Sequence, residues 1–330
     1  MKAFDYWHPI LRTKDLKRKP VSVNFCGREV VLFRGQDGTL AALEDCCPHR
    51  RMRLSKGKVK GNRLVCPYHG WSYDQSGKGI SPSTSALYPC VKSYEVTERC
   101  CAIWVKEHGS TAELPTLAKP GLHHVCTLHY HIRAPLELVV DNFCEIEHSC
   151  TTHILLGHDL EAISLVESRI ETTDDAVRII NKGPQKKMPR LLEYLLGYKR
   201  GDLFVGELEI LFSPVRVNIR NYWTSSNASE CRKREAQGTV VFNPVNDQET
   251  EIMLFSFMSQ ELSVFSRLLN PLATFLLDFE TRLDQKMLEG IADKDTKLTG
   301  VQLGRFDKPL GLTRERIKRL YWQRDFTPLP

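Results

Sequence analysis

The chain has 330 residues, of which 42% are apolar and 26% charged, and its formal net charge is +6. At roughly 100–200 residues per domain, this length predicts two or three domains. The average composition excludes a disordered chain, a collagen-like repeat and a membrane bundle. The longest nearly apolar run, Leu268 to Leu277, contains Asn270 and Pro271 and is too short to cross a bilayer. The small excess of positive charge does not indicate a nucleic-acid-binding protein.

The N-terminal sequence and the number of cysteines indicate in which cellular compartment we expect the protein. No apolar signal core followed by small residues comes after Met1, so we expect a cytoplasmic protein that does not bind membranes. The 11 cysteines are an odd number and far too few for a disulfide scaffold. In a chain without a signal peptide they indicate thiols or metal ligands.

The first third of the sequence is rich in short strands and turns. Val21–Phe25, Glu29–Phe33 and Thr39–Leu43 are β-rich runs separated by turn sequences. They predict a small all-β domain over residues 1–114. The segment Leu114–Gly121 contains two prolines and a glycine and is the predicted linker.

Residues 115–330 predict an antiparallel sheet with helices on one side, so the fold class is α+β. An alternating strand, Val125–Arg133, comes first, and a helix beginning near Pro135 follows it. Helices are also expected at about Leu262–Ala292 and at Thr313–Gln323. The further predicted strands are 162–171, 176–181, 203–212, 215–223, 238–242 and 251–257.

The first metal-ligating constellation is Cys47-Pro-His49, followed after 16 residues by Cys66-Pro-Tyr-His69. One thiolate and one imidazole from each of two loops fit a Rieske [2Fe-2S] centre, in which cysteines bind one iron and histidines the other. A tetrahedral zinc site is the alternative, but zinc motifs usually pair their cysteines in one run and their histidines in another. Cys46 is an alternative ligand, but the shorter Cys-x-His spacing to His49 favours Cys47.

His148 and His153 form the second constellation. On a continuous helix, residues five apart point about 140° away from each other, at roughly 100° per residue. The two imidazoles can therefore share a metal only if the helix ends or distorts between them, and the β-branched pair Thr151-Thr152 favours such a break. A lone pair of histidines at this spacing is more often structural.

If the two imidazoles share a metal, a carboxylate from the last long helix could complete the ligand set. With Leu276 placed at 0° of a helical wheel, Glu280 and Asp284 lie at about 40° and about 80°, inside an arc of apolar residues. An ionised carboxylate in an apolar core needs a partner, and a metal is one such partner. An ordinary ion pair with Lys or Arg is the other interpretation.

The two constellations together resemble the Rieske non-haem iron oxygenases. The stretch from Cys47 to Trp71 is similar to the Rieske domain of that family. The stretch from Asp141 to His153 is similar to its Asp-Asn-x-x-acid-x-x-His-x4-His segment. The segment that begins at Asp284, Asp-Gln-Lys-Met-Leu-Glu-Gly-Ile, is similar to the one that carries its third iron ligand.

This resemblance implies two metal centres and a residue between them. It implies a [2Fe-2S] Rieske cluster whose ligands are Cys47, His49, Cys66 and His69. It also implies a mononuclear Fe(II) whose ligands are His148, His153 and Asp284. It also implies that Glu145 belongs to the catalytic machinery and links His148 to His69 of a neighbouring subunit. The family usually has Asp at that position, and Glu is one methylene longer.

The resemblance also implies a helix-grip (START-like) catalytic domain over residues 115–330 and homotrimers packed head to tail. Such enzymes use O₂ and electrons that a ferredoxin or flavin reductase passes on from NAD(P)H. The short single chain is most similar to the vanillate and dicamba O-demethylase branch. We therefore expect a monooxygenase that hydroxylates or oxidatively demethylates a small aromatic or heterocyclic substrate.

Three other functions remain open at this point. They are an aromatic-ring cis-dihydroxylating dioxygenase, a non-catalytic Rieske electron-transfer or redox-sensing protein, and a zinc-stabilised ligand-binding module. The second would lack the mononuclear iron, and the third would lack the visible absorption of the cluster.

Two surface and cavity predictions follow. Seven basic residues and no acidic one lie between Arg50 and Arg63. Such a run is often only a solvated face, but its place between the two ligand pairs favours a docking surface for an acidic ferredoxin or reductase.

Alternation along the strands and proximity in the sequence predict a mainly apolar pocket. Its predicted lining residues are Thr152, Leu155, Leu156, Phe204, Phe212, Asn218, Tyr222 and Phe257.

Overall fold

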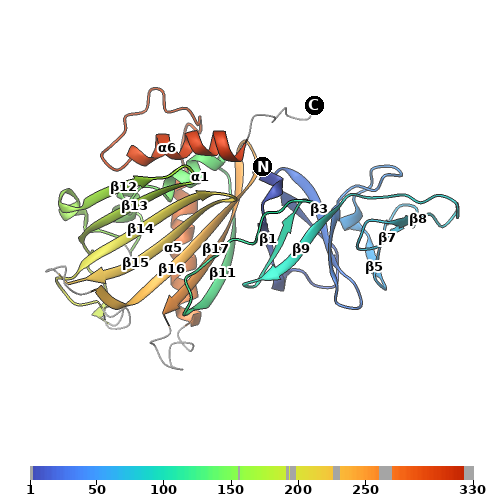
Figure 1. Ribbon diagram of the computed structural model, residues 1–330, viewed down its shortest axis with the longest axis horizontal. Coiled ribbons are helices and arrows are strands. Elements are labelled where there is room, and N and C mark those ends of the chain that lie inside the picture. The colour runs from blue at the N-terminus through green and yellow to red at the C-terminus, as the bar shows by residue number, and fades with distance from the viewer. Residues whose placement is uncertain are drawn as a thin grey trace. The chain divides into compact units, whose positions relative to one another are not determined.

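The computed structural model describes residues 3–154, 157–190, 193, 198–225, 231–259 and 270–322. The chain forms two compact units (Figure 1). The first consists of Met1–Pro115 with Asn243–Asn246, and the second of Thr116–Phe242 with Asp247–Pro330. Among the described residues, none of the helices has the length and apolar character needed to span a membrane.

The first unit is built from two antiparallel sheets. The larger has the strand order β1-β10-β9-β4-β3-β2, and the smaller has the order β5-β6-β7-β8. The strands of the larger sheet are β1 (His8–Arg12), β2 (Val21–Phe25), β3 (Arg28–Arg34), β4 (Leu40–Glu44), β9 (Ser93–Arg99) and β10 (Ala102–Lys106). Those of the smaller sheet are β5 (Lys58–Lys60), β6 (Arg63–Val65), β7 (Ser72–Tyr73) and β8 (Gly79–Ile80). Three short 3₁₀ turns, η1 (Ala3–Asp5), η2 (Thr13–Asp15) and η3 (Leu54–Lys56), complete the unit.

One apolar cluster joins the two sheets of this unit. Val31 and Phe33 of β3 and Leu64 of β6 are fully buried in it, together with Cys47 and Cys66. The alternating apolar residues of the strands therefore form the support beneath the two predicted cluster loops.

The second unit contains a seven-stranded antiparallel sheet with the order β11-β17-β16-β15-β14-β13-β12. Its strands are β11 (Leu122–Ile132), β12 (Glu167–Thr172), β13 (Ala176–Pro184), β14 (Leu203–Phe212), β15 (Val215–Thr224), β16 (Cys231–Asn246) and β17 (Glu249–Ser259). Because the strands are antiparallel, one face of the sheet can be covered by helices while the other carries polar side chains.

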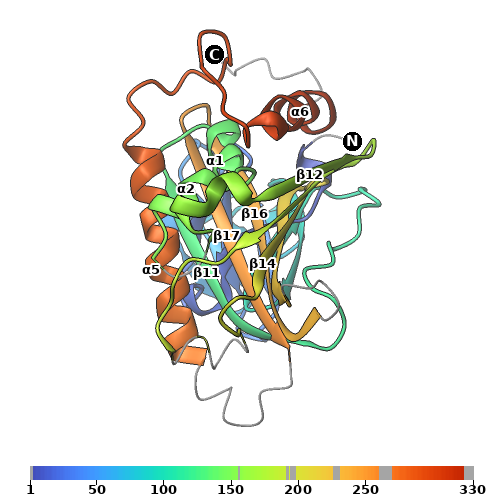
Figure 2. The same ribbon diagram turned by 90° about the vertical axis from the view of Figure 1, so that its left-hand side faces the viewer.

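Helices cover one face of this sheet. They are α1 (Leu136–Asn142), α2 (Glu147–Thr151), α5 (Asn270–Glu289) and α6 (Lys308–Arg316), with the 3₁₀ helix η4 (Leu160–Leu165) and the π-helical turn η5 (Ile317–Tyr321). Figure 2 shows α5 along the sheet, and it packs against β11 and α1. Arg314 of α6 donates to the buried Asp141 of α1 at 2.8 Å, which ties α6 to the helix that precedes the predicted iron site.

The α+β fold predicted from the sequence is confirmed, and most predicted strands agree with the structure to within a few residues. Three elements differ. The strand predicted at 238–242 is much longer in the structure and runs from Cys231 to Asn246. Residues 160–165 form a 3₁₀ helix, so the strand predicted from Ala162 begins only at Glu167. The helix predicted from Thr313 begins at Lys308, with Pro309 in its first turn, where proline is tolerated. Residues 262–269 of the long predicted helix lie outside the described residues.

Candidate functional site

The two cysteine–histidine loops of the first unit have the same backbone conformation. In each, the cysteine amide donates to the carbonyl five residues on, and the cysteine carbonyl accepts from the amide four residues on. The fifth residue of each loop has a positive φ, 55° at Arg51 and 73° at Gly70. Glycine adopts this conformation without steric cost, whereas arginine does so only in a loop that holds it there. The matching turns place Cys47 and Cys66 as equivalent residues.

The thiols of the two loops are buried. Cys47 and Cys66 are 1% and 2% exposed, and the Tyr73 hydroxyl lies 3.2 Å from the Cys47 sulfur. Burial raises the pKa of the Cys66 thiol, and its contact with Cys47 raises it further. Two buried thiols side by side are costly to ionise in isolation, and a bound metal supplies the positive charge that thiolates need.

The imidazoles of the two loops lie nearer the surface than the thiols. The ring centroids of His49 and His69 are 4.3 Å apart, and His49 stacks on Trp71 at 4.4 Å with an interplanar angle of 3°. The Nδ1 atom of His49 is buried and has no hydrogen-bond partner among the described residues. A buried thiol pair below and an imidazole pair above fit a cluster with one sulfur-ligated and one nitrogen-ligated iron.

The second candidate site lies in the second unit, where α2 ends between two histidines. His148 is within α2, which stops at Thr151, and His153 follows beyond its end. The predicted helix break is therefore confirmed. Ligand atoms of His148, His153 and Asp284 all lie within 4.8 Å of one another. Oδ1 of Asp284 is 2.9 Å from Nε2 of His153 and 3.6 Å from Nε2 of His148. Two imidazoles and one carboxylate on one side of an open space fit the ligand set of non-haem Fe(II) sites.

The structure separates the two carboxylates that the sequence left as candidates. Glu280 and Asp284 are both buried on α5, one turn apart. The Glu280 oxygens each lie 3.1 Å from the amide nitrogen of Ile154, so this carboxylate holds the backbone next to His153. Asp284 alone faces both histidines. The apolar arc predicted for this helix is only partly buried, since Met287 is 46% exposed.

Glu145 fixes the start of α2 and the orientation of His148. Its Oε2 accepts from the amides of Glu147 at 2.6 Å and His148 at 3.2 Å, and its Oε1 contacts Nδ1 of His148. A proton on Nδ1 that points to this carboxylate leaves Nε2 free for a metal. Burial alone would lower the pKa of His148, but the hydrogen bond and charge of Glu145 outweigh it, and the pKa is raised.

Lys186 holds the other end of α2. Its ammonium donates to the carbonyl oxygens of Ser149, Cys150 and His153 at 2.8, 3.1 and 2.7 Å. These are carbonyls that the end of a helix leaves without an intrahelical partner. The sequence analysis missed Lys186, because nothing in a lone lysine 33 residues beyond His153 indicates this contact.

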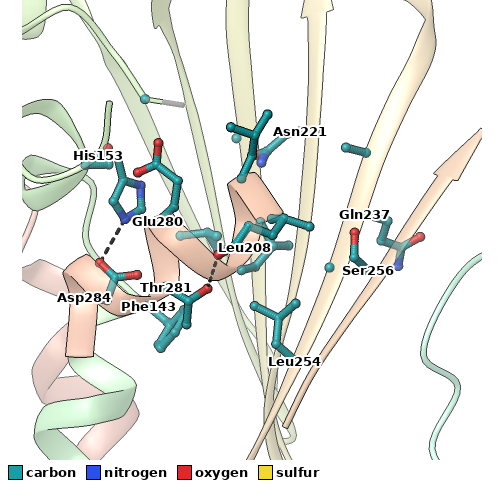
Figure 3. A pocket seen from close by; sticks show the side chains of 18 of the residues that line it. Phe143, His153, Leu208, Asn221, Gln237, Leu254, Ser256, Glu280, Thr281 and Asp284 are labelled. Carbon is teal, nitrogen blue, oxygen red and sulfur yellow. Dashed lines mark hydrogen bonds and ion pairs between the residues drawn. The ribbon is translucent and has the colours of Figure 1, made fainter. Parts of the chain in front are cut away.

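A cavity of about 320 Å³ opens beside the three ligand atoms. Figure 3 shows His153 and Asp284 at one part of its wall and Asn221, Leu254 and Ser256 at another. Residues of α5, of the α1–α2 region and of strands β14 to β17 line it. Apolar side chains in the lining include Phe143, Met188, Phe204, Leu208, Ile219, Leu254, Met258, Leu276 and Leu277. A mostly apolar cavity with a few polar groups is typical of a small-molecule site.

Comparison with known proteins identifies the first unit. Residues 6–111 match the Rieske [2Fe-2S] domain family. The N-terminal unit is a Rieske domain. The cysteine and histidine pairs of its two loops lie within the matched residues.

Curated relatives match about half of this chain. The vanillate O-demethylase oxygenase subunit of Pseudomonas sp. (strain HR199 / DSM 7063) is 31% identical over 159 residues, which is 44% of this chain and 44% of that protein. The dicamba O-demethylase oxygenase component of Stenotrophomonas maltophilia is 28% identical over 193 residues, 54% of this chain and 55% of that protein. The match thus spans about half the length of these relatives.

Solved structures share the fold over nearly the whole chain. Dicamba monooxygenase bound to 3,6 dichlorosalicylic acid has a TM-score of 0.81 at 18% identity and covers 96% of this chain and 97% of that chain. The NdmA QL mutant of Pseudomonas putida CBB5 with caffeine has a TM-score of 0.72 at 22% identity and covers 95% and 89%. Both units therefore have the fold of these solved structures.

The pocket predicted from the sequence agrees with the structure at one residue, Phe204. Asn218, Tyr222 and Phe257 are not in the lining, because the neighbouring residues Ile219, Asn221, Ser256 and Met258 face the cavity instead. Strand side chains alternate between the faces, so a shift of one residue selects the wrong face. Thr152 and Phe212 also lie outside the lining, and Leu155 and Leu156 fall outside the described residues.

Proposed function

We propose that this chain is the oxygenase component of a Rieske-type system that hydroxylates or oxidatively demethylates a small aromatic or heterocyclic substrate. One observation carries the proposal. In a chain with a Rieske domain, ligand atoms of His148, His153 and Asp284 lie within 4.8 Å of one another at the wall of an apolar cavity. Relatives named as vanillate and dicamba O-demethylase oxygenase components support the demethylase branch.

The proposal gives each group of residues a role. Cys47, His49, Cys66 and His69 would hold the Rieske cluster, and His148, His153 and Asp284 would hold Fe(II). Bound Fe(II) supplies the site for dioxygen activation, with electrons delivered by the cluster. Glu145 keeps the proton of His148 on Nδ1, and Glu280 and Lys186 hold the backbone beside His153. The apolar wall binds the substrate and excludes water from it.

The basic run of the Rieske domain supports an acidic reductase or ferredoxin as electron donor. Arg53 is paired with Glu29 and Arg63 with Asp74. The remaining basic residues are exposed and form no ion pair within the described part of the chain: Arg50, Arg51, Lys56, Lys58 and Lys60. Five exposed cations beside the cluster loops would attract a negatively charged partner.

We further propose a head-to-tail homotrimer in which Glu145 accepts a hydrogen bond from His69 of the partner subunit. An ionised carboxylate has about four acceptor positions. Three of those of Glu145 are used, by the amides of Glu147 and His148 and by the imidazole of His148. One position is therefore left for a donor from outside the chain.

The test starts from metal content. We expect three irons and two acid-labile sulfides per chain in the purified holoprotein, with the EPR signal of a Rieske centre when reduced. Addition of a flavin reductase and NADH should then give substrate-dependent O₂ uptake and a product with one added oxygen atom or one methyl group fewer. Two irons per chain with no mononuclear site would instead identify an electron-transfer protein. Two added oxygen atoms would identify a dioxygenase.

The ligands of the cluster are tested separately. The variant His69→Ala should lose the Rieske EPR signal but still take up Fe(II) at the second site. A variant that keeps the visible and EPR spectra of the wild type would show that His69 does not bind the cluster.

A further inference from the structure

Three strands place a single amide side chain between small residues on the cavity wall. Gly206 of β14 pairs with Asn221 of β15, and Asn221 pairs with Ala236 of β16. One step along the same face, Ile219 pairs with Gly238. All five residues line the cavity. Asn221 therefore lies in a section of the wall where its cross-strand neighbours, Gly206 and Ala236, have almost no side chain.

Neither glycine in this wall is required by the fold itself. Gly206 and Gly238 do not have the positive φ that favours glycine. A Cβ atom at Gly206 would meet its nearest neighbours at 3.7 Å, and one at Gly238 at 3.8 Å, which are ordinary contacts. Glycine inside a strand costs stability and is common where a ligand approaches the backbone closely. The two glycines thus indicate a flat surface kept open for a planar molecule.

The carboxamide of Asn221 has no hydrogen-bond partner in the part of the chain that the structure describes. The nearby Asn218, which points to the other face, differs from it. Its Nδ2 donates to Glu209 at 3.0 Å, and its Oδ1 accepts from Thr239 at 2.9 Å. Leu208, Ile219 and Leu254 in the lining offer no polar atom of their side chains to Asn221. An amide in such surroundings gains most from a ligand that satisfies both its donor and its acceptor.

We propose that Asn221 selects the substrate by pairing its Oδ1 and Nδ2 with an adjacent N–H and C=O of a neutral, planar heterocycle of the lactam class. The inference rests on the proposed function, because it treats the cavity as the substrate site. The size fits one or two rings, since about 320 Å³ is near the lower end of ligand pockets, which hold roughly 300–1,000 Å³. Charge also fits a neutral ligand. The described lining contains no Lys or Arg that could pair with an anionic ligand.

Binding to the purified holoprotein tests the inference without turnover. The probes are 2-quinolinone, which is a planar lactam, naphthalene, which has the same shape without polar atoms, and 2-naphthoate, which is an anion. Titration calorimetry gives the dissociation constants. We expect the wild type to bind 2-quinolinone tighter than either of the other probes. Asn221→Leu, which keeps the size of the side chain, should weaken 2-quinolinone about tenfold and leave naphthalene as tight or tighter.

Two control variants separate recognition from shape. Asn218→Leu changes an amide on the opposite face of the same strand and should leave the preference for the lactam unchanged. Gly206→Val fills the flat surface and should weaken 2-quinolinone and naphthalene alike. A wild type that binds no lactam, or binds naphthalene or 2-naphthoate at least as tightly, would overturn the inference, and so would an Asn221→Leu variant with unchanged affinity. Selective lactam binding without mononuclear iron or O₂ uptake would contradict the proposed function and keep this inference.

Discussion

The ammonium of Lys186 donates to the carbonyl oxygen of His153 at 2.7 Å, directly behind an imidazole that faces Asp284. The same ammonium binds the carbonyls of Ser149 and Cys150 in the last turn of α2. A positive charge is favourable at the C-terminal end of a helix. One side chain thus binds three carbonyl oxygens along the segment from His148 to His153.

Lys186→Met should weaken Fe(II) binding at the second site. The substitution keeps the aliphatic stem and removes the three donors, so His153 loses its fixed position. We expect Fe(II) affinity to fall roughly 10–100-fold, as for other partners that orient metal ligands. The measurement is Fe(II) titration of the protein with its Rieske absorption unchanged. Lys187→Met, at the exposed next residue, is the control. Equal Fe(II) affinity in the wild type and Lys186→Met would disprove this role.

Asp284→Ala and Glu280→Gln should have different effects. Loss of Asp284 removes the carboxylate that faces both histidines, so we expect an intact Rieske spectrum but no bound mononuclear iron. Product formation should fall by more than the roughly 10–100-fold that is typical when a residue hydrogen-bonded to a metal ligand is lost. Glu280→Gln keeps an oxygen that can accept from the Ile154 amide and should retain most of the iron. The iron content and the product yield of both variants are the measurements. The reverse order of effects would make Glu280 the ligand.

Glu145→Gln should slow electron transfer while both metal sites still fill. The glutamine has one acceptor oxygen, which cannot serve the imidazole and the two amides that the carboxylate serves now. We expect oxidation of the reduced cluster to slow by roughly 10–100-fold. Glu145→Asp should be faster than Glu145→Gln, because it keeps the charge and both oxygens. Single-turnover oxidation with substrate and O₂ is the measurement. Oxidation of Glu145→Gln at the wild-type rate would show that electrons take another route.

Charge reversal in the basic run should slow reduction by the partner. In Arg50→Glu/Lys58→Glu/Lys60→Glu we expect a lower rate at limiting reductase and a smaller dependence on salt, while single turnover of pre-reduced protein stays unchanged. The matched control reverses three other exposed cations of the same unit, at Lys17, Arg18 and Lys19. Equal rates for both triple variants at low salt would mean that the run is only a solvated face.

His158 should make stability depend on pH. Burial lowers its pKa to about 4, against about 6.5 in an unfolded chain. Between these values the unfolded state binds a proton that the folded state does not, so the free energy of unfolding falls as the pH falls, by at most about 1.4 kcal/mol per pH unit. Denaturant unfolding from pH 7.5 to 5 should show a smaller slope in His158→Gln than in the wild type. The exposed His131→Gln should keep the wild-type slope, and the same slope in all three proteins would contradict the prediction.

Much of the fold and the candidate metal-ligating residues could be predicted from the sequence, because the signals are local. The four proposed cluster ligands lie within the 23 residues from Cys47 to His69, and the turns that present them are short. The strand Leu203–Phe212 was predicted with its correct ends, since its composition and the turns around it fix the strand. Helix geometry requires a break between His148 and His153 if the two imidazoles share a metal, and α2 does end at Thr151.

Tertiary structure decided what depends on contacts between distant segments. Asp284 is 131 residues from His153, and one helical turn separates it from Glu280, so only the packing of α5 determines which carboxylate faces the histidines. Asn221 rather than Asn218 lines the cavity because strand register determines which side chains point to each face. Lys186 joins the site because the chain after β13 returns to the end of α2. A sequence pattern records periodicity along one segment, whereas these three side chains take their roles from segments that the fold brings beside them.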